Sequence, residues 1–323
     1  MELVKKGIRT NEIGKIISDQ FVMDDDYNVP DAKADIKRVV SGEGRVHIEE
    51  IRRVENYLRI SGKLLFKVLY VTDVAFPELE ALKGQIPFEE MVYVEAGKDD
   101  EFVVQEVGVD FSATVIHSRK LAVKAMIDLA IHAERMSEEE SAIDVEGDEH
   151  IFKRVCPVEI LQLHTSKRDI YRIKEELTVP GTKENISTLI WTDVNLRKID
   201  TKISQDTIMF TGTLQVFAFY KSEEDKTDWV EQMIPFEGKI ICNNIEEGFY
   251  HHIYHNLTDI NVEARMDSDG EMRNLGIEAT LEMRILVYQE ERVNLLEDIY
   301  SLEKECVLGK RKATYEELIT QNH

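Results

Sequence analysis

Alternation of apolar and polar residues is the main pattern along the chain. From Leu58 to Tyr70, and again from Ile208 to Tyr220, apolar side chains occupy every second position. A period of two is typical of a strand with one buried face. Further alternating runs cover 46–51, 91–94, 121–129, 194–199 and 275–285. The pattern predicts about six strands in each half of the chain and a mainly β protein.

The two halves of the sequence match one another at an offset of about 150 residues. The matched segments, in order, are 29–36 with 179–186, 60–64 with 210–214, Tyr70 with Tyr220, 86–89 with 234–237, and 119–123 with 273–277. Five matches in the same order indicate a tandem duplication. We therefore predict two homologous domains, residues 1–145 and 146–292, each β-sandwich-like or barrel-like with a few short helices.

Residues 293–323 are interpreted as the start of a third repeat that is truncated or degenerate. Asp298-Ile299-Tyr300 repeats the earlier Asp169-Ile170-Tyr171. We favour the interpretation that the sequence is a fragment of a longer protein.

Helical patterns are few and short. A short helix or turn is predicted after each Val-Pro pair, at 33–40 and 184–191, and a further helix at 314–321. The acidic run 137–149 contains few apolar residues. Such a run is typical of a solvated, mobile linker, and it places the domain boundary near residue 145.

Charge narrows the classes of partner. The 323 residues include 40 Lys and Arg against 63 Asp and Glu, a formal net charge of −23. Binding of nucleic acid or of an anionic membrane surface requires clustered cations, so both are disfavoured, and a basic or metal-rich partner is favoured. No apolar run reaches the roughly 18 residues of a membrane-spanning helix. Three widely spaced cysteines indicate a reducing compartment.

One group of histidines is a candidate metal site. His251 and His255 would share one face of a helix, with His252 beside them. The first half has no matching histidines, and the local pattern favours strand and loop. We expect solvent-exposed histidines, no catalytic residue and no cofactor. Asp267-Ser268-Asp269-Gly270 resembles part of a calcium loop, but it is better explained as a hairpin turn with Gly270 at positive φ.

The two tryptophans occur only in the second half. Trp191 follows an apolar stretch and is predicted to lie in the core. Trp229 is flanked by charged residues, so it is the candidate for an exposed protein-binding anchor.

The repeated segments resemble a known family. The segments are a Val-Pro-x-x-Lys turn, the strand 58–70, Ile86-Pro87-Phe88 and a strand that begins Arg119-Lys120-Leu121. Together they resemble the SPOCS domain of spore-coat morphogenetic proteins in endospore-forming Firmicutes, and the plan is similar to that of the clostridial SipL-type adaptors. The resemblance covers both copies.

The resemblance implies a role in the mother cell, at the forespore surface. Adaptors of that family bind the coat-basement ATPase, largely through a LysM module that follows the SPOCS domains. No LysM stretch is evident in this sequence, so the resemblance leaves the repeats as a scaffold or a secondary binding surface, and it implies no catalytic residues.

The favoured hypothesis is a non-enzymatic, cytoplasmic assembly or adaptor protein of the spore coat. Its partners would be the coat-basement ATPase or other coat proteins, with self-association at open sheet edges. One alternative is a tandem β-sandwich protein of the cell envelope that binds a ligand, although residues 1–9 lack the apolar core of a signal peptide. The other is a metal-dependent hydrolase that uses the three histidines.

Overall fold

The computed structural model describes residues 2–95, 97, 100–147, 150–303, 305–307 and 309–310. These residues form thirteen strands and no helix. The strands are arranged in four sheets, and neighbouring strands pair in antiparallel fashion. The prediction of a mainly β protein with two similar halves is confirmed.

The first half contains seven strands: β1 (Glu2–Ile13), β2 (Ile17–Asn28), β3 (Ile36–Val54), β4 (Tyr57–Thr72), β5 (Leu79–Tyr93), β6 (Glu101–His117) and β7 (Lys120–Glu146). One sheet has the order β3-β4-β5. In the other, the long strand β7 pairs with β6 on one edge and with β2 and then β1 on the opposite edge. Strand β7 therefore pairs with every other strand of its sheet.

The second half contains six strands: β8 (Ile151–Thr178), β9 (Ile186–Ser204), β10 (Thr207–Ser222), β11 (Thr227–Ile241), β12 (Tyr250–Met266) and β13 (Met272–Ser301). Its sheets have the orders β9-β10-β11 and β8-β13-β12. The continuous strand β8 pairs along β13, as β1 and β2 together pair along β7. The two halves therefore share one plan.

In each half the two sheets bury alternate side chains against one another. On the central strand β4 the buried residues include Leu58, Ile60 and Leu64, and on β10 they include Ile208 and Phe210. Each half has its own core. The predicted apolar parity is thus the buried face, and removal of this apolar surface from water is the main force that holds each sandwich together.

Of the short helix or turn predicted after each Val-Pro pair, the structure has the turn, and no helix forms over 33–40 or 184–191. Lys33 N–H donates to Pro30 O, and Lys183 N–H donates to Pro180 O, each at 2.9 Å, so each pair starts a tight turn. Strands β3 and β9 begin directly afterwards. The β-branched residues that follow each turn favour strand, because such side chains fit a pleated sheet. The helix predicted at 314–321 lies outside the described residues.

The acidic run 137–149 is not a mobile linker. Residues 137–146 belong to β7 and pair with residues 2–10 of β1. Lys5 contacts Glu140 at 2.9 Å and Arg9 contacts Glu138 at 3.2 Å. Two of the acidic residues thus form ion pairs with basic residues of the neighbouring strand, a pairing that a pattern search over neighbouring residues does not detect. Residues 148 and 149 lie outside the described residues.

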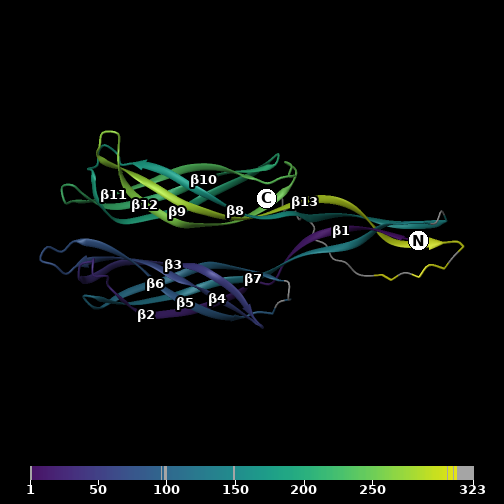
Figure 1. Ribbon diagram of the computed structural model, residues 1–323, viewed down its shortest axis with the longest axis horizontal. Coiled ribbons are helices and arrows are strands. Elements are labelled where there is room, and N and C mark those ends of the chain that lie inside the picture. Colours follow the sequence, from purple (N-terminus) through teal and green to yellow (C-terminus); the bar gives the residue numbers. More distant parts are fainter. Residues whose placement is uncertain are drawn as a thin grey trace, which may run out of the picture.

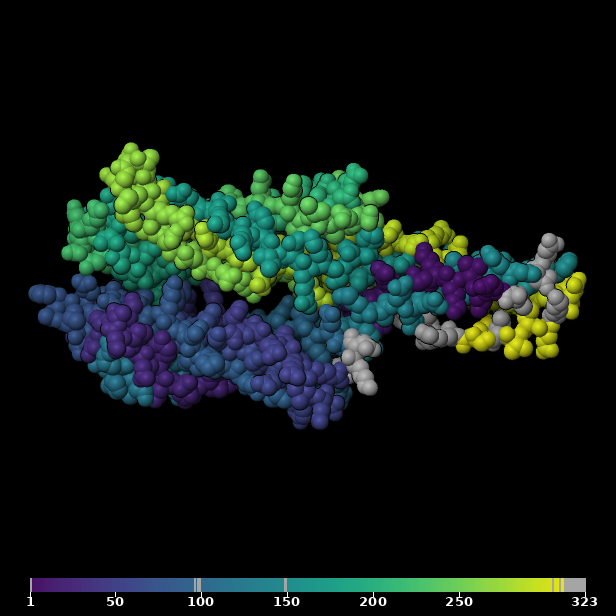
Figure 2. Space-filling model, viewed as in Figure 1, coloured from purple at the N-terminus to yellow at the C-terminus, as the bar shows by residue number. Residues whose placement is uncertain are grey.

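The ends of the long strands form an extension that we call the stalk: residues 2–13, 134–146, 151–162 and 289–301. In Figure 1 the two halves lie side by side and the stalk projects from one end, with β1 and the end of β13 in it. A small core of Ile8, Ile160 and Val293 joins its two ribbons. Figure 2 shows the two halves lying side by side, with the stalk extending beyond them.

The predicted third repeat falls on the end of β13 and on residues beyond it. Residues 293–301 continue β13 and pair with β8. Most of the following segment, including 311–323, lies outside the described residues. The boundaries at 145 and 292, and the third repeat itself, remain predictions.

Candidate functional site

An arginine holds the Val-Pro turn in each half. Arg119 donates from Nη2 to Val29 O at 3.0 Å and to Pro30 O at 2.9 Å, and from Nη1 to Lys33 O at 2.6 Å. A guanidinium presents several donors in a fixed plane, so one side chain can bind several carbonyl oxygens of a turn. The repeated arginine therefore has a structural role.

The second half repeats this arrangement. Arg273 donates from Nη2 to Val179 O at 3.4 Å, to Pro180 O at 2.8 Å and to Lys183 O at 2.9 Å. The Val-Pro and Arg segments that matched in sequence are thus the two sides of one contact. Their recurrence reflects this contact, and it gives no indication of a catalytic site.

A second repeated contact joins a glycine to an aromatic ring across neighbouring strands. Gly62 is paired with Phe88, and Gly212 with Phe236. A Cβ on Gly212 would overlap the Phe236 ring. Each mid-strand glycine thus allows a close approach: the Phe236 ring at Gly212, and the His47 carbonyl oxygen together with the Phe88 ring at Gly62.

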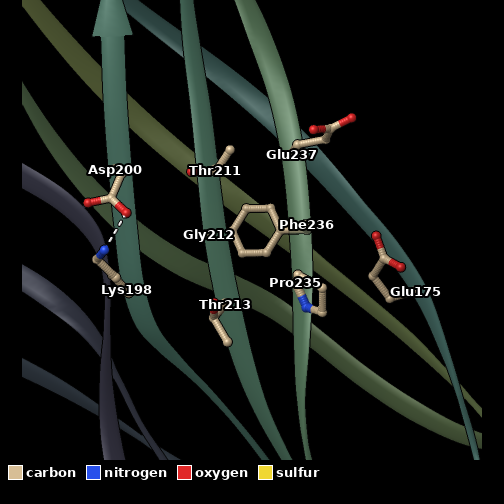
Figure 3. A pocket seen from close by; sticks show the side chains of 9 residues that line it. All are labelled: Glu175, Lys198, Asp200, Thr211, Gly212, Thr213, Pro235, Phe236 and Glu237. Carbon is tan, nitrogen blue, oxygen red and sulfur yellow. Dashed lines mark ion pairs between the residues drawn. The ribbon is translucent and has the colours of Figure 1, made fainter.

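A shallow pocket of the second half lies around Gly212 and Phe236 (Figure 3). It has a volume of about 510 Å³, and Figure 3 shows the Phe236 ring beside Gly212. The polar side chains around it are three carboxylates, two threonines and one lysine, and Lys198 is already paired with Asp200 at 2.6 Å. A glycine beside a large ring accounts for the hollow without a ligand.

The two halves are joined by charged side chains that reach from one sheet to another. Arg45 on β3 contacts Asp193 at 2.8 Å and Asn195 at 3.1 Å. Lys67 on β4 donates to Thr192 O at 2.7 Å, and its ammonium lies 4.7 Å from the centre of the Trp191 ring. Strand β9 of the second half is therefore held against the β3-β4-β5 sheet of the first.

Trp191 consequently lies where the sequence did not predict. It was expected in the core, but it is only partly buried, and it is on the outer face of its sheet beneath Lys67. The position of Trp191 depends on the charge of the lysine opposite it. That lysine is 124 residues away in the chain, so the local sequence around Trp191 does not indicate the contact.

A buried polar cluster lies where the stalk meets the lobes. The Glu134 side chain is fully buried. Its carboxylate accepts hydrogen bonds from Arg284 Nη2 at 2.5 Å and from Asn11 Nδ2 at 3.4 Å, and it lies 3.0 Å from His132 Nε2. The same amide nitrogen of Asn11 lies 3.4 Å from the Tyr288 hydroxyl. Strands β1, β7 and β13 meet here, so the cluster connects both halves through ionised groups.

Glu134 is kept ionised by its partners. Burial raises the pKa of this carboxyl, but the hydrogen bonds from Arg284 and His132 and the Arg284 charge outweigh burial and hold the pKa below its ordinary value. A buried carboxylate with an arginine partner stabilises a structure only while both groups remain in place.

The candidate protein anchor Trp229 is on the outer face of β11. Its side chain is 51% exposed. It stacks on Phe217 at 6.2 Å between ring centres, and the Lys183 ammonium lies 5.3 Å from its ring centre. The Trp229 ring is therefore accessible and held in position.

The candidate metal pair does not form a helical face. His251 and His255 lie on strand β12, where residues four apart are separated by roughly 13 Å. His251 Nε2 is hydrogen-bonded to Thr201 Oγ1 at 2.7 Å, and burial, with a smaller effect of His252, lowers the pKa of His251. His252 packs against Tyr254. Among the residues that the structure describes, no three His, Cys, Asp or Glu side chains are placed to hold one metal ion.

The segment 267–270 forms the predicted hairpin turn between β12 and β13. Gly270 has a φ of 84°, and Asp267 Oδ1 accepts the backbone N–H groups of Asp269 and Glu271 at 2.9 and 3.0 Å. The Asp267 carboxylate thus accepts the hydrogen bonds of the turn's own backbone N–H groups.

A family model for the SipL SPOCS domain matches the chain twice, at residues 35–116 and 185–265. The chain belongs to the SipL SPOCS-domain family. Each match covers the β3-β4-β5 sheet and β6 of the first SPOCS domain, or β9-β10-β11 and β12 of the second. The resemblance seen in the sequence is confirmed. Proteins with SPOCS domains are spore-coat morphogenetic proteins, so the family points to a structural protein of the coat.

Two further comparisons add nothing to the family match. Neither a curated protein nor a solved structure matches the chain. In the described part of the chain there is no helix that could cross a membrane.

Proposed function

We propose that this protein is a non-enzymatic assembly protein of the bacterial spore coat, which acts as an adaptor through protein–protein contacts. The observation that carries the proposal is the pair of SPOCS matches, one in each half. A coat assembly protein must present stable surfaces in fixed positions. Two sandwiches joined by a stalk and by charged contacts suit that requirement.

The repeated residues support a structural role for the domain itself. Arg119 and Arg273 are engaged with the Val-Pro turns, and Phe236 is engaged with Gly212. Since these side chains maintain the fold, recognition of a partner falls to the outer faces of the sheets. Pro87 and Pro235 lie on the edge strands β5 and β11, where a missing N–H disfavours addition of a further strand.

The proposed partners are the coat-basement ATPase or other coat proteins, in the mother-cell cytoplasm at the forespore surface. A net charge of −23 favours a partner with a basic surface. Self-association remains a second mode of assembly within this proposal.

The test is microscopy of sporulating cells that express the native full-length protein fused to a fluorescent protein. We expect a signal around the forespore that begins when the coat is laid down. The free fluorescent protein, expressed from the same promoter, is the control for diffuse signal. A fusion that stays diffuse through sporulation, while remaining intact on a gel, would contradict the proposal.

A further inference from the structure

Two tryptophan–carboxylate pairs flank the central strand β10 of the β9-β10-β11 sheet. The first pair is Trp191 and Asp193 on β9, and the second pair is Trp229 and Glu231 on β11. Both tryptophans are paired in register with Phe219. Both carboxylates are paired with the residue two positions earlier, Phe217. Directly paired residues share a face, so the outer face of this sheet presents the same arrangement on either side of β10.

The first pair is occupied by cations of the first SPOCS domain. The Lys67 ammonium lies over the Trp191 ring at 4.7 Å and is 4.0 Å from Asp193. Arg45 adds an ion pair with Asp193 at 2.8 Å. The protein itself therefore shows what this arrangement binds: basic side chains from neighbouring strands of a sheet, one over the ring and one against the carboxylate.

The second pair has a similar chemistry and faces solvent. Trp229 is 51% exposed, and Glu231 is exposed with Gln215 as its neighbour. Phe217 supports one side of the Trp229 ring, as the stacked geometry at 6.2 Å indicates. The Lys183 ammonium of the same domain, which is paired with Asp228 at 2.6 Å, lies 5.3 Å from the ring centre, and about half of the tryptophan surface remains exposed beside it.

The fold does not require these residues. In the first domain the positions paired in the same way are Ser41, Leu69 and Ala81, where the second domain has Trp191, Phe219 and Trp229. The same three-stranded sheet forms with small and aliphatic side chains. The second tryptophan–carboxylate pair is therefore an addition to the domain plan.

We propose that Trp229 and Glu231 form a docking site for a strand of a partner protein that presents lysine or arginine side chains. The site continues the face that already holds the two domains together, and its charge complements a basic strand. The inference rests on the proposed function, because it names the chemistry of the partner that the assembly protein would recognise.

The probe is a synthetic peptide of alternating lysine and valine, titrated into the full chain by calorimetry at physiological salt, which screens long-range attraction. Trp229→Ala and Glu231→Lys are each expected to weaken binding roughly tenfold. The first removes the ring that a cation of the peptide would contact, and the second removes the carboxylate that would pair with a cation. The matched controls are Met209→Ala and Glu237→Lys, which change exposed residues further along the same face. Binding by both controls should stay within about twofold of wild type.

Three outcomes would overturn the inference. The first is equal weakening by Glu237→Lys and Glu231→Lys, which would indicate attraction by net charge alone. The second is equal binding of a peptide of alternating glutamate and valine. The third is a dimer in sedimentation that Glu231→Lys abolishes, because the occupant would then be a second copy of this chain. Each readout is made in vitro, so it is independent of where the protein localises in cells.

Discussion

At the scale of single residues, two arginines and one glutamate hold several strands in place. Arg119 and Arg273 fix the turns that start the β3 and β9 strands, and Glu134 joins three strands at the base of the stalk. The importance of Arg119 and Arg273 could be inferred from the sequence, because both copies contain the residue at the matched position. The role of Glu134 could not be inferred, since its partner Arg284 belongs to the other copy.

We expect Arg119→Ala to destabilise the first domain by about 3 kcal/mol, because hydrogen bonds from a charged donor are each worth about 1.5–3 kcal/mol. For a domain of this size that corresponds to a fall of about 6–12 °C in melting temperature, measured by calorimetry. Arg273→Ala should act similarly on the second domain. Arg172→Ala, at an exposed site on β8, is the control. An Arg119→Ala protein as stable as this control would show that the turn does not depend on the guanidinium.

Replacement of Glu134 should make stability depend differently on pH. Glu134→Gln leaves Arg284 without its anionic partner and should cost about 3 kcal/mol at neutral pH. The pKa of Glu134 is lower in the folded state than its ordinary value. Its stabilisation is therefore complete above an unfolded-state pKa of about 4.3 and is lost as pH falls through the lower folded value.

The difference in unfolding free energy between wild type and Glu134→Gln should thus be constant from pH 7 to about 5 and shrink at lower pH. Urea unfolding at several pH values measures it. Glu290→Gln, an exposed change on β13, serves as the control. A difference that grows as the solution becomes more acidic would refute the assigned direction of the pKa shift.

At the scale of elements, the stalk is the least expected part of the fold. The alternating runs were predictable, because each strand carries its own period of apolar residues. Pairing of β1 with the end of β7 was not, because it depends on Lys5 and Arg9 meeting Glu140 and Glu138 more than 120 residues away. No helix forms at 33–40 or 184–191 for a different reason: the turn itself is locally similar to a helix start, but the β-branched residues that follow it favour strand.

Ile8 tests the stalk, since it is fully buried in the small core there. Ile8→Ala should cost about 2–5 kcal/mol of local stability, by loss of buried surface and creation of a cavity. Hydrogen exchange should then become faster at residues 137–146, while 57–72 of β4 remain protected. Leu3→Ala, at a half-exposed position in the same strand, is the control. Unchanged exchange in Ile8→Ala would mean that the stalk is not held by this core.

At the scale of the whole molecule, the contact between the two SPOCS domains defines the surface that a partner meets. The duplication could be predicted from the sequence, but the contact between the domains could not. Neither Lys67 nor Trp191 has a local sequence pattern that indicates the other as its partner. Trp229 was predicted to be exposed on the basis of its charged neighbours, and it is exposed.

Lys67→Glu should loosen the contact, since it places a negative charge beside Glu43 and Asp193. We expect a larger radius of gyration in small-angle X-ray scattering. Lys63→Glu makes the same charge change on the same strand, but its partner Glu49 lies within the first domain, so it should leave the radius unchanged. Equal radii for the two variants would indicate that the stalk alone positions the domains.

If this SPOCS protein takes part in building the spore coat, loss of its gene should damage the coat. The measurement is electron microscopy of spores from a strain that lacks the gene. We expect coat material that is absent from, or detached from, the forespore surface, with recovery when the intact gene is restored. Spores with a complete and attached coat in the absence of the gene would contradict it.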